Sequence, residues 1–158
     1  MINISKIQLI DIPIIFKFID SNFNDFKYFI DLGWTKKNIK NHFEKNNNYS
    51  LGYFKNKQLN GILLGETIFF ENKLALEIHI FVIEKESRQK KIGTKILDFV
   101  KINKKITKIS KIYLEVAENN LNALKFYEKN NFVFLKFRHN YYKINNENIN
   151  AKCYLKEI

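Results

Sequence analysis

The sequence SRQKKIGTKIL, which occupies Ser87–Leu97, decides the fold of this 158-residue chain. An apolar run typical of a strand, Ile78–Ile83, precedes it, and an amphipathic run with helical spacing continues to about Lys104. A strand, a short loop rich in donors and a helix start bring backbone N–H groups together, and the helix dipole favours negative charge there. The stretch therefore predicts an anion site, with phosphate as the expected guest.

This loop does not match the two most common nucleotide-binding motifs. Its only glycine is Gly93, so it fits neither G-x-x-x-x-G-K-[ST] nor G-x-G-x-x-G. Lysine-rich loops before helices are also common in a basic chain. The surrounding elements must therefore identify the phosphate.

Length and composition limit the class of protein. We expect one domain spanning residues 1–158, since a chain of this length can bury a sizeable core. Hydrophobic residues make up 46% and aromatic residues 15%, which favours a globular body. No apolar run approaches the ~20 residues that span a bilayer, and Met1–Ile4 does not begin a signal peptide. We therefore expect a soluble cytoplasmic protein with no membrane association.

The single cysteine and the net charge of +11 bear on cofactors and partners. Cys153 has no partner for an intramolecular disulfide, and no Cys/His cluster has zinc spacing, so we expect no metal. The charge invites a nucleic-acid reading, but only Arg88 and Arg138 of the 27 basic residues are arginines, and the lysines are spread over the whole chain. Nucleic acid is therefore disfavoured as the main partner.

Hydrophobic periodicity predicts a mixed α/β chain. We expect strands at 4–10, 50–54, 59–69, 74–83, 111–117, 132–138 and 151–155, and helical stretches at 14–19, 23–30, 36–45, 92–104 and 120–129. Asparagine-rich segments at 46–48 and 145–150 read as loops. Three consecutive strands favour an antiparallel meander, and the strand–helix–strand unit that follows requires a parallel pair with a right-handed crossover.

Several short motifs resemble the GNAT N-acetyltransferase family over roughly Leu51–Leu155. The basic loop Arg88–Gly93 is similar to the family's Q/R-x-x-G-x-G/A signature, and LEV at 114–116 is followed by N-x-x-A-x-x-FYEK at 120–129. The resemblance implies a central sheet of about seven strands with splayed middle strands and about four helices. Within the family the chain resembles the RimI-type ribosomal-protein-alanine N-acetyltransferases, on Tyr127 twelve positions after Glu115, Trp34 before an early helix, and RHNYY at 138–142.

Two positions depart from the family pattern. Lys91 stands where the signature has its middle glycine, so its Cβ would crowd the cofactor or its ammonium would reach a phosphate oxygen. Asn131 replaces the glycine usual after the last helix, and Asn tolerates the left-handed conformation that such a cap requires.

Acetyl transfer to an amine needs a proton acceptor and a donor for the departing thiolate. The resemblance assigns the base to Glu115 and the acid to Tyr127, with Glu77 on the preceding strand as the reserve base. Outside this context Glu115 would be a solvent-facing strand residue and Tyr127 a core residue. His79 and His139 are interpreted as a sheet and a loop histidine without chemistry.

The same resemblance implies acetyl-CoA as the acetyl donor and assigns its contacts. The expected cofactor-binding residues are Phe81, Val82, Ile83, Arg88, Gln89, Lys90, Lys91, Ile92, Gly93, Thr94, Asn120, Ala123 and Tyr127. Asn120 is also a natural helix N-cap. The expected acceptor-binding residues are Trp34, Ile80, Tyr141 and Tyr142. A structural role is equally good for three of them: Trp34 as an anchor against the sheet, and Tyr141 and Tyr142 as the aromatic pair of a hairpin.

The sequence therefore predicts direct acetyl transfer, without an acyl-enzyme, to a primary amine. The preferred acceptor is the N-terminal alanine of a ribosomal protein. An amino sugar or another small amine is the alternative acceptor. A catalytically idle acyl-CoA-binding or ribosome-associated module is the alternative from another class of protein, and the oligomeric state stays open.

Overall fold

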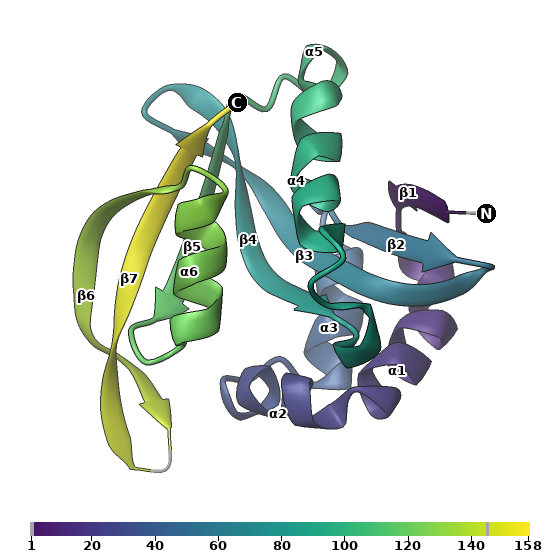
Figure 1. Ribbon diagram of the computed structural model, residues 1–158, viewed down its shortest axis with the longest axis horizontal. Helices are drawn as coiled ribbons and strands as arrows, with labels where there is room; N and C mark the ends of the chain where they lie inside the picture. Colours follow the sequence, from purple (N-terminus) through teal and green to yellow (C-terminus); the bar gives the residue numbers. More distant parts are fainter. Residues whose placement is uncertain (1, 145) are drawn as a thin grey trace.

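A seven-stranded mixed sheet forms the centre of the computed structural model, which describes residues 2–144 and 146–158 (Figure 1). The strands lie in the order β1-β2-β3-β4-β5-β7-β6. Their bounds are β1 Ile2–Lys6, β2 Leu51–Lys55, β3 Gln58–Phe70, β4 Lys73–Ile83, β5 Lys111–Ala117, β6 Val133–Ile144 and β7 Glu147–Glu157. The helices are α1 Ile12–Ser21, α2 Phe23–Asp31, α3 Lys36–Phe43, α4 Ile92–Ile102, α5 Lys104–Thr107 and α6 Leu121–Lys129, with 3-10 turns η1 Leu9–Asp11 and η2 Lys85–Ser87.

Helices cover both faces of the sheet and enclose two separate cores. Helices α4 and α6 pack on one face, over a core that includes Ile96, Leu124 and Tyr127. Helices α1, α2 and α3 supply Ile15, Phe26 and other apolar side chains to the core on the opposite face. We call the face covered by α4 and α6 the donor face, because the residues expected to bind acetyl-CoA at 88–94 and 120–127 belong to it. We call the face covered by α1, α2 and α3 the acceptor face, because Trp34, expected to bind the acceptor, packs there.

A β-bulge in β4 changes the face to which its side chains point. Leu64 of β3 pairs with Ile80, but the next residue, Gly65, pairs with Ile78, so His79 is one residue in excess. Before the bulge Ile78 belongs to the donor-face core, whereas after it Ile80 belongs to the acceptor-face core. A strand without the bulge would keep both on one face, because side chains alternate with a period of two.

Strands β4 and β5 pair over only part of their length and then separate. They are parallel, and their register runs from Ala75 opposite Lys111 to Ile78 opposite Leu114. Beyond Ile78, β4 has a strand partner only on its β3 side within the described residues. Figure 1 shows the resulting wedge, with β4 turning away from β5 and β7. The predicted splay of the middle strands is therefore confirmed.

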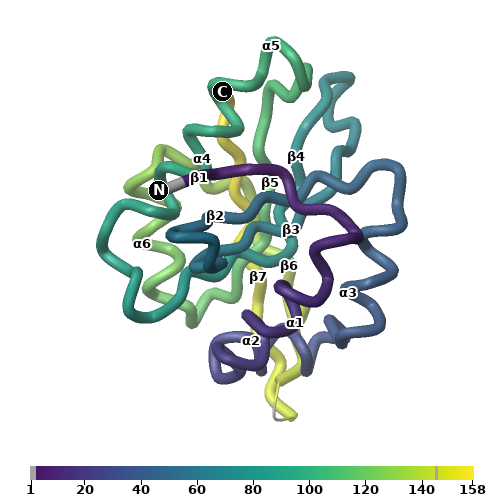
Figure 2. The backbone as a smooth tube through the Cα atoms, turned by 90° about the vertical axis from the view of Figure 1, so that its right-hand side faces the viewer, coloured from purple at the N-terminus to yellow at the C-terminus, as the bar shows by residue number. Residues whose placement is uncertain are grey.

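The end of β6 reaches α2 across this opening (Figure 2). Tyr142 of β6 and Tyr28 of α2 have ring centroids 5.8 Å apart. Leu32, the residue that follows α2, packs against the same small core, which contains Ala117 and Ala151. The contact joins the two halves of the molecule at the wide end of the wedge.

The predicted fold class, the antiparallel meander β2–β3–β4 and the parallel β4–β5 pair are confirmed, and the differences lie at element ends and in the number of helices. The first strand ends at Lys6 rather than Ile10, because the chain turns into η1 before α1. The last two strands run through most of the segment predicted as a long loop, and Asn145 lies outside the described residues. The described residues form six α-helices, which are the five stretches predicted from periodicity and the short α5 after α4, whereas the resemblance implied about four. None of these helices, in the part described, is long and apolar enough to cross a membrane.

Candidate active site

The open part of the β4–β5 wedge forms a cavity of about 460 Å³. Residues from both strands, from α2, α6 and the hairpin tip line it: Tyr28, Phe29, Leu32, Trp34, Glu77, Ile78, His79, Phe81, Leu114, Glu115, Val116, Ala117, Asn120, Ala123, Tyr127, Tyr141 and Tyr142. Two carboxylates, a histidine and several aromatic rings therefore meet where the two strands part. This composition is typical of a site for a ligand with a cationic group.

Glu115 is held by donors from its own strand and from β6. Its Oε1 accepts hydrogen bonds from Arg138 Nη1 at 2.6 Å and from the Tyr113 hydroxyl at 2.9 Å, and its side chain is 12% exposed. The Arg138 guanidinium also stacks 3.8 Å above the centre of the Tyr141 ring. These contacts fix the carboxylate of Glu115 at the inner wall of the cavity.

Glu77 faces the same cavity from β4 and differs in its surroundings. Burial raises the pKa of Glu77, and the charges of Glu115 and Glu66 raise it further, against the opposing charges of His79 and Arg138. A carboxylate with a raised pKa is a stronger base near neutral pH. The two glutamates therefore lie close enough for the charge of Glu115 to act on Glu77.

Tyr127 reaches the cavity from α6 while its ring packs in the donor-face core. Its centroid lies 5.3 Å from those of Phe126 and Phe132. Burial raises the pKa of the Tyr127 hydroxyl well above its ordinary value. The group therefore stays protonated at neutral pH and is available as a hydrogen-bond donor.

The basic loop before α4 has a backbone suited to an anion. Gln89 and Lys91 both have a φ of +59°. Arg88, which precedes them and follows η2, has an extended backbone. Lys91 is the N-cap residue of α4, an eleven-residue helix whose first N–H groups have no intrahelical acceptor. Alternation of left-handed and right-handed residues turns successive N–H groups toward one point. The position where the family signature has a glycine is thus a left-handed position in this chain, occupied by lysine.

Arg88 links this loop to α2. Its Nη2 lies 2.5 Å from Asp25 Oδ2, and its Nε donates to the Ile83 carbonyl oxygen at 2.9 Å. Asp25 is one helical turn before Tyr28, which lines the cavity. The Arg88 guanidinium therefore links the basic loop, which we also call the anion loop, to α2, a helix that lines the cavity.

Two further residues show why their types occur at these places. Asn120 caps α6, since its Oδ1 accepts from the Ala123 N–H at 3.2 Å, and it also lines the cavity. At Gly93 a Cβ would lie 2.8 Å from Phe126 Cζ, so a larger residue would push α4 and α6 apart. Both residues shape the donor side of the cavity.

The structure brings together only part of the residue set predicted for the site. Of that set, the cavity is lined by Glu115, Tyr127, Phe81, Asn120, Ala123, Trp34, Tyr141 and Tyr142, with the reserve base Glu77. The side chains of Ile80, Val82 and Ile92 are buried in the cores, so only their backbone is placed to meet a ligand. Ile83 and the loop Arg88–Thr94 do not line the cavity. They follow in the chain after β4 residues that do line it, such as Phe81.

Tyr28 and Phe29 of α2 and the adjacent Leu32 were not predicted from the sequence as site residues. No role in the site was predicted for His79 or Arg138 either. The α2 side chains follow an amphipathic pattern that is typical of any surface helix, so no local signal marks them. Arg138 stood inside the RHNYY segment at 138–142, and its charge opposite Glu115 was the available signal. Among the described residues no group of three or more His, Cys, Asp or Glu side chains is arranged to hold a metal ion.

Comparison with known proteins identifies this architecture. A family model described as an acetyltransferase (GNAT) domain matches residues 14–152. The chain belongs to the GNAT acetyltransferase family. It is an acetyl-CoA-dependent acyltransferase. No curated protein sequence matches the chain significantly.

Solved structures share the fold at low sequence identity. Arabidopsis thaliana NAA60 in complex with a bisubstrate analogue superposes with a TM-score of 0.78 at 14% identity, covering 99% of this chain and 98% of that one. The ribosomal-protein-S18-alanine N-acetyltransferase of Escherichia coli gives 0.75 at 16% identity, over 100% and 94%. A probable acetyltransferase of Staphylococcus epidermidis gives 0.78 at 18% identity, over 99% of each chain.

Proposed function

We propose that this GNAT enzyme acetylates the N-terminal amine of a protein, with the N-terminal alanine of a ribosomal protein as the preferred acceptor. The observation that carries the proposal is the pair Glu77 and Glu115 at the point where β4 and β5 part, in a cavity that Trp34 and Tyr141 also line. Carboxylates and aromatic faces both attract an ammonium group. The RimI-type sequence marks at Trp34 and 138–142 fall in this same region, which supports a peptide acceptor.

The donor side fits acetyl-CoA. The unpaired edge of β4 beyond Ile78 offers backbone groups to an extended ligand, as an added strand would use them. The left-handed residues Gln89 and Lys91 and the start of α4 suit its pyrophosphate. Asn120, Ala123 and Phe81 would border its extended arm. When bound, acetyl-CoA supplies an acetyl group activated as a thioester.

The chain's own residues would handle the protons. Glu77 takes the proton of the acceptor ammonium, because its raised pKa makes it a stronger base near neutral pH. Glu115, fixed by Arg138, holds the amine in place. Tyr127 donates a hydrogen bond, and then its proton, to the leaving sulfur from the other wall.

The experiment compares acceptors at equal concentration. Release of free coenzyme A from acetyl-CoA is measured with a peptide that begins with alanine, with the same peptide N-terminally blocked, and with glucosamine, and the product is located by mass spectrometry. We expect release with the free peptide only, and the acetyl group on its α-amine. Release with glucosamine alone would overturn the peptide assignment.

A second acceptor class has one observation in its favour. Tyr28 and Tyr142 line the cavity and contact each other across it, and a space of about 460 Å³ is large enough for an amino sugar or another small amine. The glucosamine reaction in the same experiment tests this alternative.

A further inference from the structure

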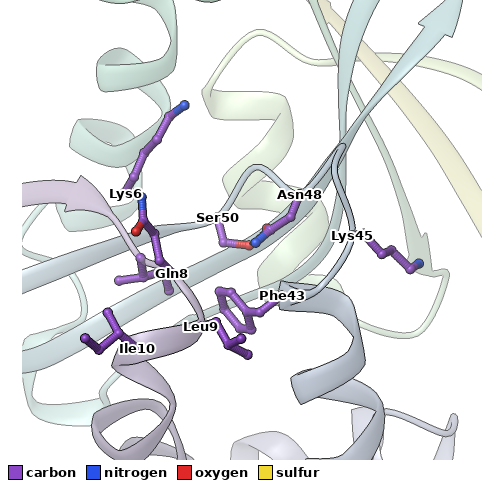
Figure 3. Close-up of a pocket in the computed structure, with 9 residues that line it drawn as sticks. Lys6, Gln8, Leu9, Ile10, Phe43, Lys45, Asn48 and Ser50 are labelled. Carbon is purple, nitrogen blue, oxygen red and sulfur yellow. The ribbon is translucent and has the colours of Figure 1, made fainter.

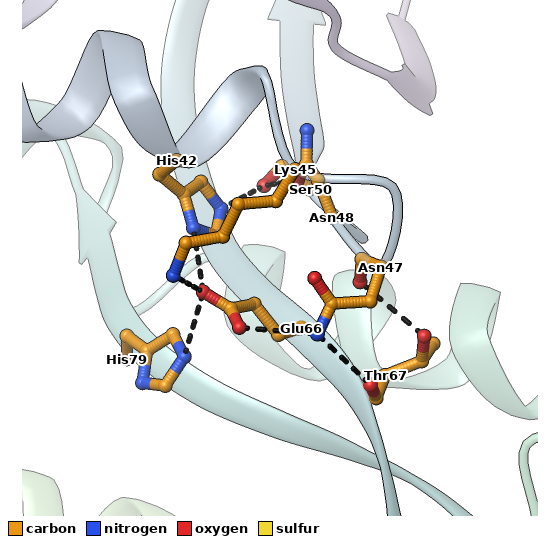
Figure 4. A network of polar contacts seen from close by, with 8 residues as sticks. All are labelled: His42, Lys45, Asn47, Asn48, Ser50, Glu66, Thr67 and His79. Atoms are coloured by element: carbon orange, nitrogen blue, oxygen red, sulfur yellow. Dashed lines mark hydrogen bonds and ion pairs between the residues drawn. The ribbon is translucent and has the colours of Figure 1, made fainter.

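A line of polar side chains runs from the active-site cavity to a second cavity on the acceptor face (Figure 4). His79 lines the active site, and its Nε2 lies 3.7 Å from Glu66 Oε1. The same oxygen lies 3.2 Å from His42 Nδ1. We call His79, Glu66, His42 and Ser50 the polar chain.

The far end of the polar chain opens into the second cavity. His42 Nε2 lies 3.1 Å from Ser50 Oγ, and the Ser50 hydroxyl donates to Asn48 Oδ1 at 2.7 Å. Ser50 and Asn48 line a cavity of about 380 Å³ together with Lys6 and Gln8 (Figure 3). The two cavities are therefore connected by side chains that can each pass a proton or accept a hydrogen bond.

Burial of His42, in the middle of the polar chain, is energetically unfavourable. His42 is 1% exposed and lies between the rings of Trp34 and Phe43, at 5.6 and 5.5 Å. A polar group in such a setting costs several kcal/mol unless its hydrogen bonds are satisfied. An apolar residue of similar size would serve packing better, so packing alone does not account for His42.

A count of protons shows that the hydrogen bonds are not all satisfied when His42 is neutral. The contacts Glu66–His42, His42–Ser50 and Ser50–Asn48 need one proton each. A carboxylate and an amide oxygen only accept, while a neutral imidazole and a hydroxyl hold one proton apiece. Two protons serve three contacts, so the polar chain has a place for one more.

We propose that the polar chain is a proton relay that carries the proton of the acceptor amine from the active site to the second cavity. The proposal rests on the acetyl transfer to an amine set out above, and it makes His79 the first member of the relay. Each step moves one proton and no electrons, so the polar chain ends with the protons it began with.

The transfers run along the polar chain, whose first link, His79 Nε2 to Glu66 Oε1 at 3.7 Å, must shorten to a hydrogen bond as the proton passes. Glu77 takes the proton as the ammonium N–H bond breaks, and passes it to Nδ1 of His79, the ring nitrogen that does not face Glu66; both residues line the active-site cavity. His79 releases its Nε2 proton to Glu66 Oε1, which passes a proton to His42 Nδ1. His42 gives its Nε2 proton to Ser50, and the hydroxyl proton that Ser50 had donated to Asn48 Oδ1 leaves to solvent in the second cavity, which both residues line.

The charges around the relay suit this role. Burial lowers the pKa of both His79 and His42, so both rings are neutral at neutral pH and free to accept. Glu77 and Glu66 act on His79 in the opposite sense, while Lys45 and His42 reinforce the lowering. Lys45 Nζ also donates to Glu66 Oε1 at 2.6 Å and is half exposed, which keeps that carboxylate ionised between transfers.

Turnover provides the first test. With the alanine-starting peptide, Glu66→Gln keeps the size of the side chain but removes its ability to pass a proton, and we expect kcat at pH 7 to fall about tenfold while KM for acetyl-CoA stays within about twofold. Ser50→Ala interrupts the far end and should give a similar loss. Thr67→Val is the matched control, because it removes only the hydrogen bond to the Asn47 carbonyl beside the relay and should leave kcat unchanged.

Two readouts separate a relay from a merely structural role. Added imidazole should restore several-fold of the lost activity in His79→Ala, since a free base can replace the missing ring. The double variant Glu66→Gln/Ser50→Ala should be no slower than either single variant, because one interruption already blocks the relay. Unchanged kcat in both single variants, or full additivity without an imidazole response, overturns the proposal.

A test that needs no acceptor uses the three histidines of the chain. In nitrogen-detected NMR titrations of the free enzyme, His42 and His79 should share one added proton and titrate with a common midpoint, while exposed His139 serves as the internal reference. In Glu66→Gln each ring should titrate separately. Independent titration of the two rings in the wild type overturns the relay. If the wild type acetylates no amine, the proposed function is overturned instead, and the titration still tests the relay by itself.

Discussion

The two halves of the β4–β5 interface have opposite structural roles. From Ala75 to Ile78 the strands pair in parallel and Leu76 is fully buried, so this half holds the two parts of the sheet together. Beyond Ile78 the strands part, and the open half carries Glu115, the aromatic rings and the free strand edge, while Glu77 lies near the end of the paired half and faces the same cavity. The paired half thus mainly stabilises the sheet, and the chemistry lies where the two strands begin to part.

The largest expected effect comes from the two carboxylates that face the cavity. Glu115→Gln and Glu77→Gln should each lower turnover by about 10²-fold or more, the scale of general acid–base help. Binding of acetyl-CoA should be largely kept, because neither side chain belongs to the anion loop. Steady-state kinetics with the best acceptor and titration calorimetry with acetyl-CoA measure the two quantities.

The matched change in the paired half is Leu76→Ala. Removal of this buried side chain should cost about 2–5 kcal/mol of unfolding free energy, because a cavity is left behind. Below its melting temperature the variant should keep turnover within a few-fold of the wild type. A loss of stability in the glutamate variants equal to that of Leu76→Ala would break the division between the two halves.

Tyr127→Phe sharpens the comparison within the donor face. The ring contacts with Phe126 and Phe132 stay, while the hydroxyl is lost, so we expect turnover to fall about tenfold or more with little change in the melting temperature. Unchanged kinetics would remove the hydroxyl from the reaction.

Acidification should weaken the fold through the histidines beside the bulge. Burial holds the pKa of His42 and His79 below 6.5, so unfolding takes up protons as the pH falls below that value, and the unfolding free energy decreases. The raised pKa of Glu77 acts in the opposite sense, but it is one group against two. Urea unfolding between pH 7 and 5 measures the slope, which His42→Asn should reduce.

The smallest expected effect concerns the loop at the edge of the open half. Lys91→Gly relieves a left-handed lysine and should change the unfolding free energy by no more than about 1 kcal/mol, in the stabilising direction. We expect KM for acetyl-CoA to rise several-fold, because the ammonium beside the anion loop is lost. Gln89 has the same φ as Lys91 but no charge, so Gln89→Gly is the control. An equal rise in KM for acetyl-CoA in both variants would mean that the freedom of the backbone, and not the charge of Lys91, matters.

The sequence predicted the sheet well and the cavity only partly. Local signals, such as alternation in 111–117 and the Asn120 cap, were enough to place β5 and α6, because these depend on neighbours in the chain. The role of α2 could not be predicted, because Tyr28 meets the cavity only through its distant contact with Tyr142. Likewise, nothing local shows that Glu115 would be held by Arg138, since that pair forms only when β6 and β7 fold back beside β5.

The single extra residue in β4 also bears on how this protein tolerates insertions and deletions. Removal of His79 would make Ile78 and Ile80 consecutive residues of a regular strand, so alternation would still direct Ile80 and Val82 to the core under α1–α3 and Phe81 and Ile83 toward α4. Both hydrophobic interiors would then keep their side chains, and only the histidine and its contacts would be lost. In this strand a one-residue deletion should therefore be tolerated best at the bulge itself.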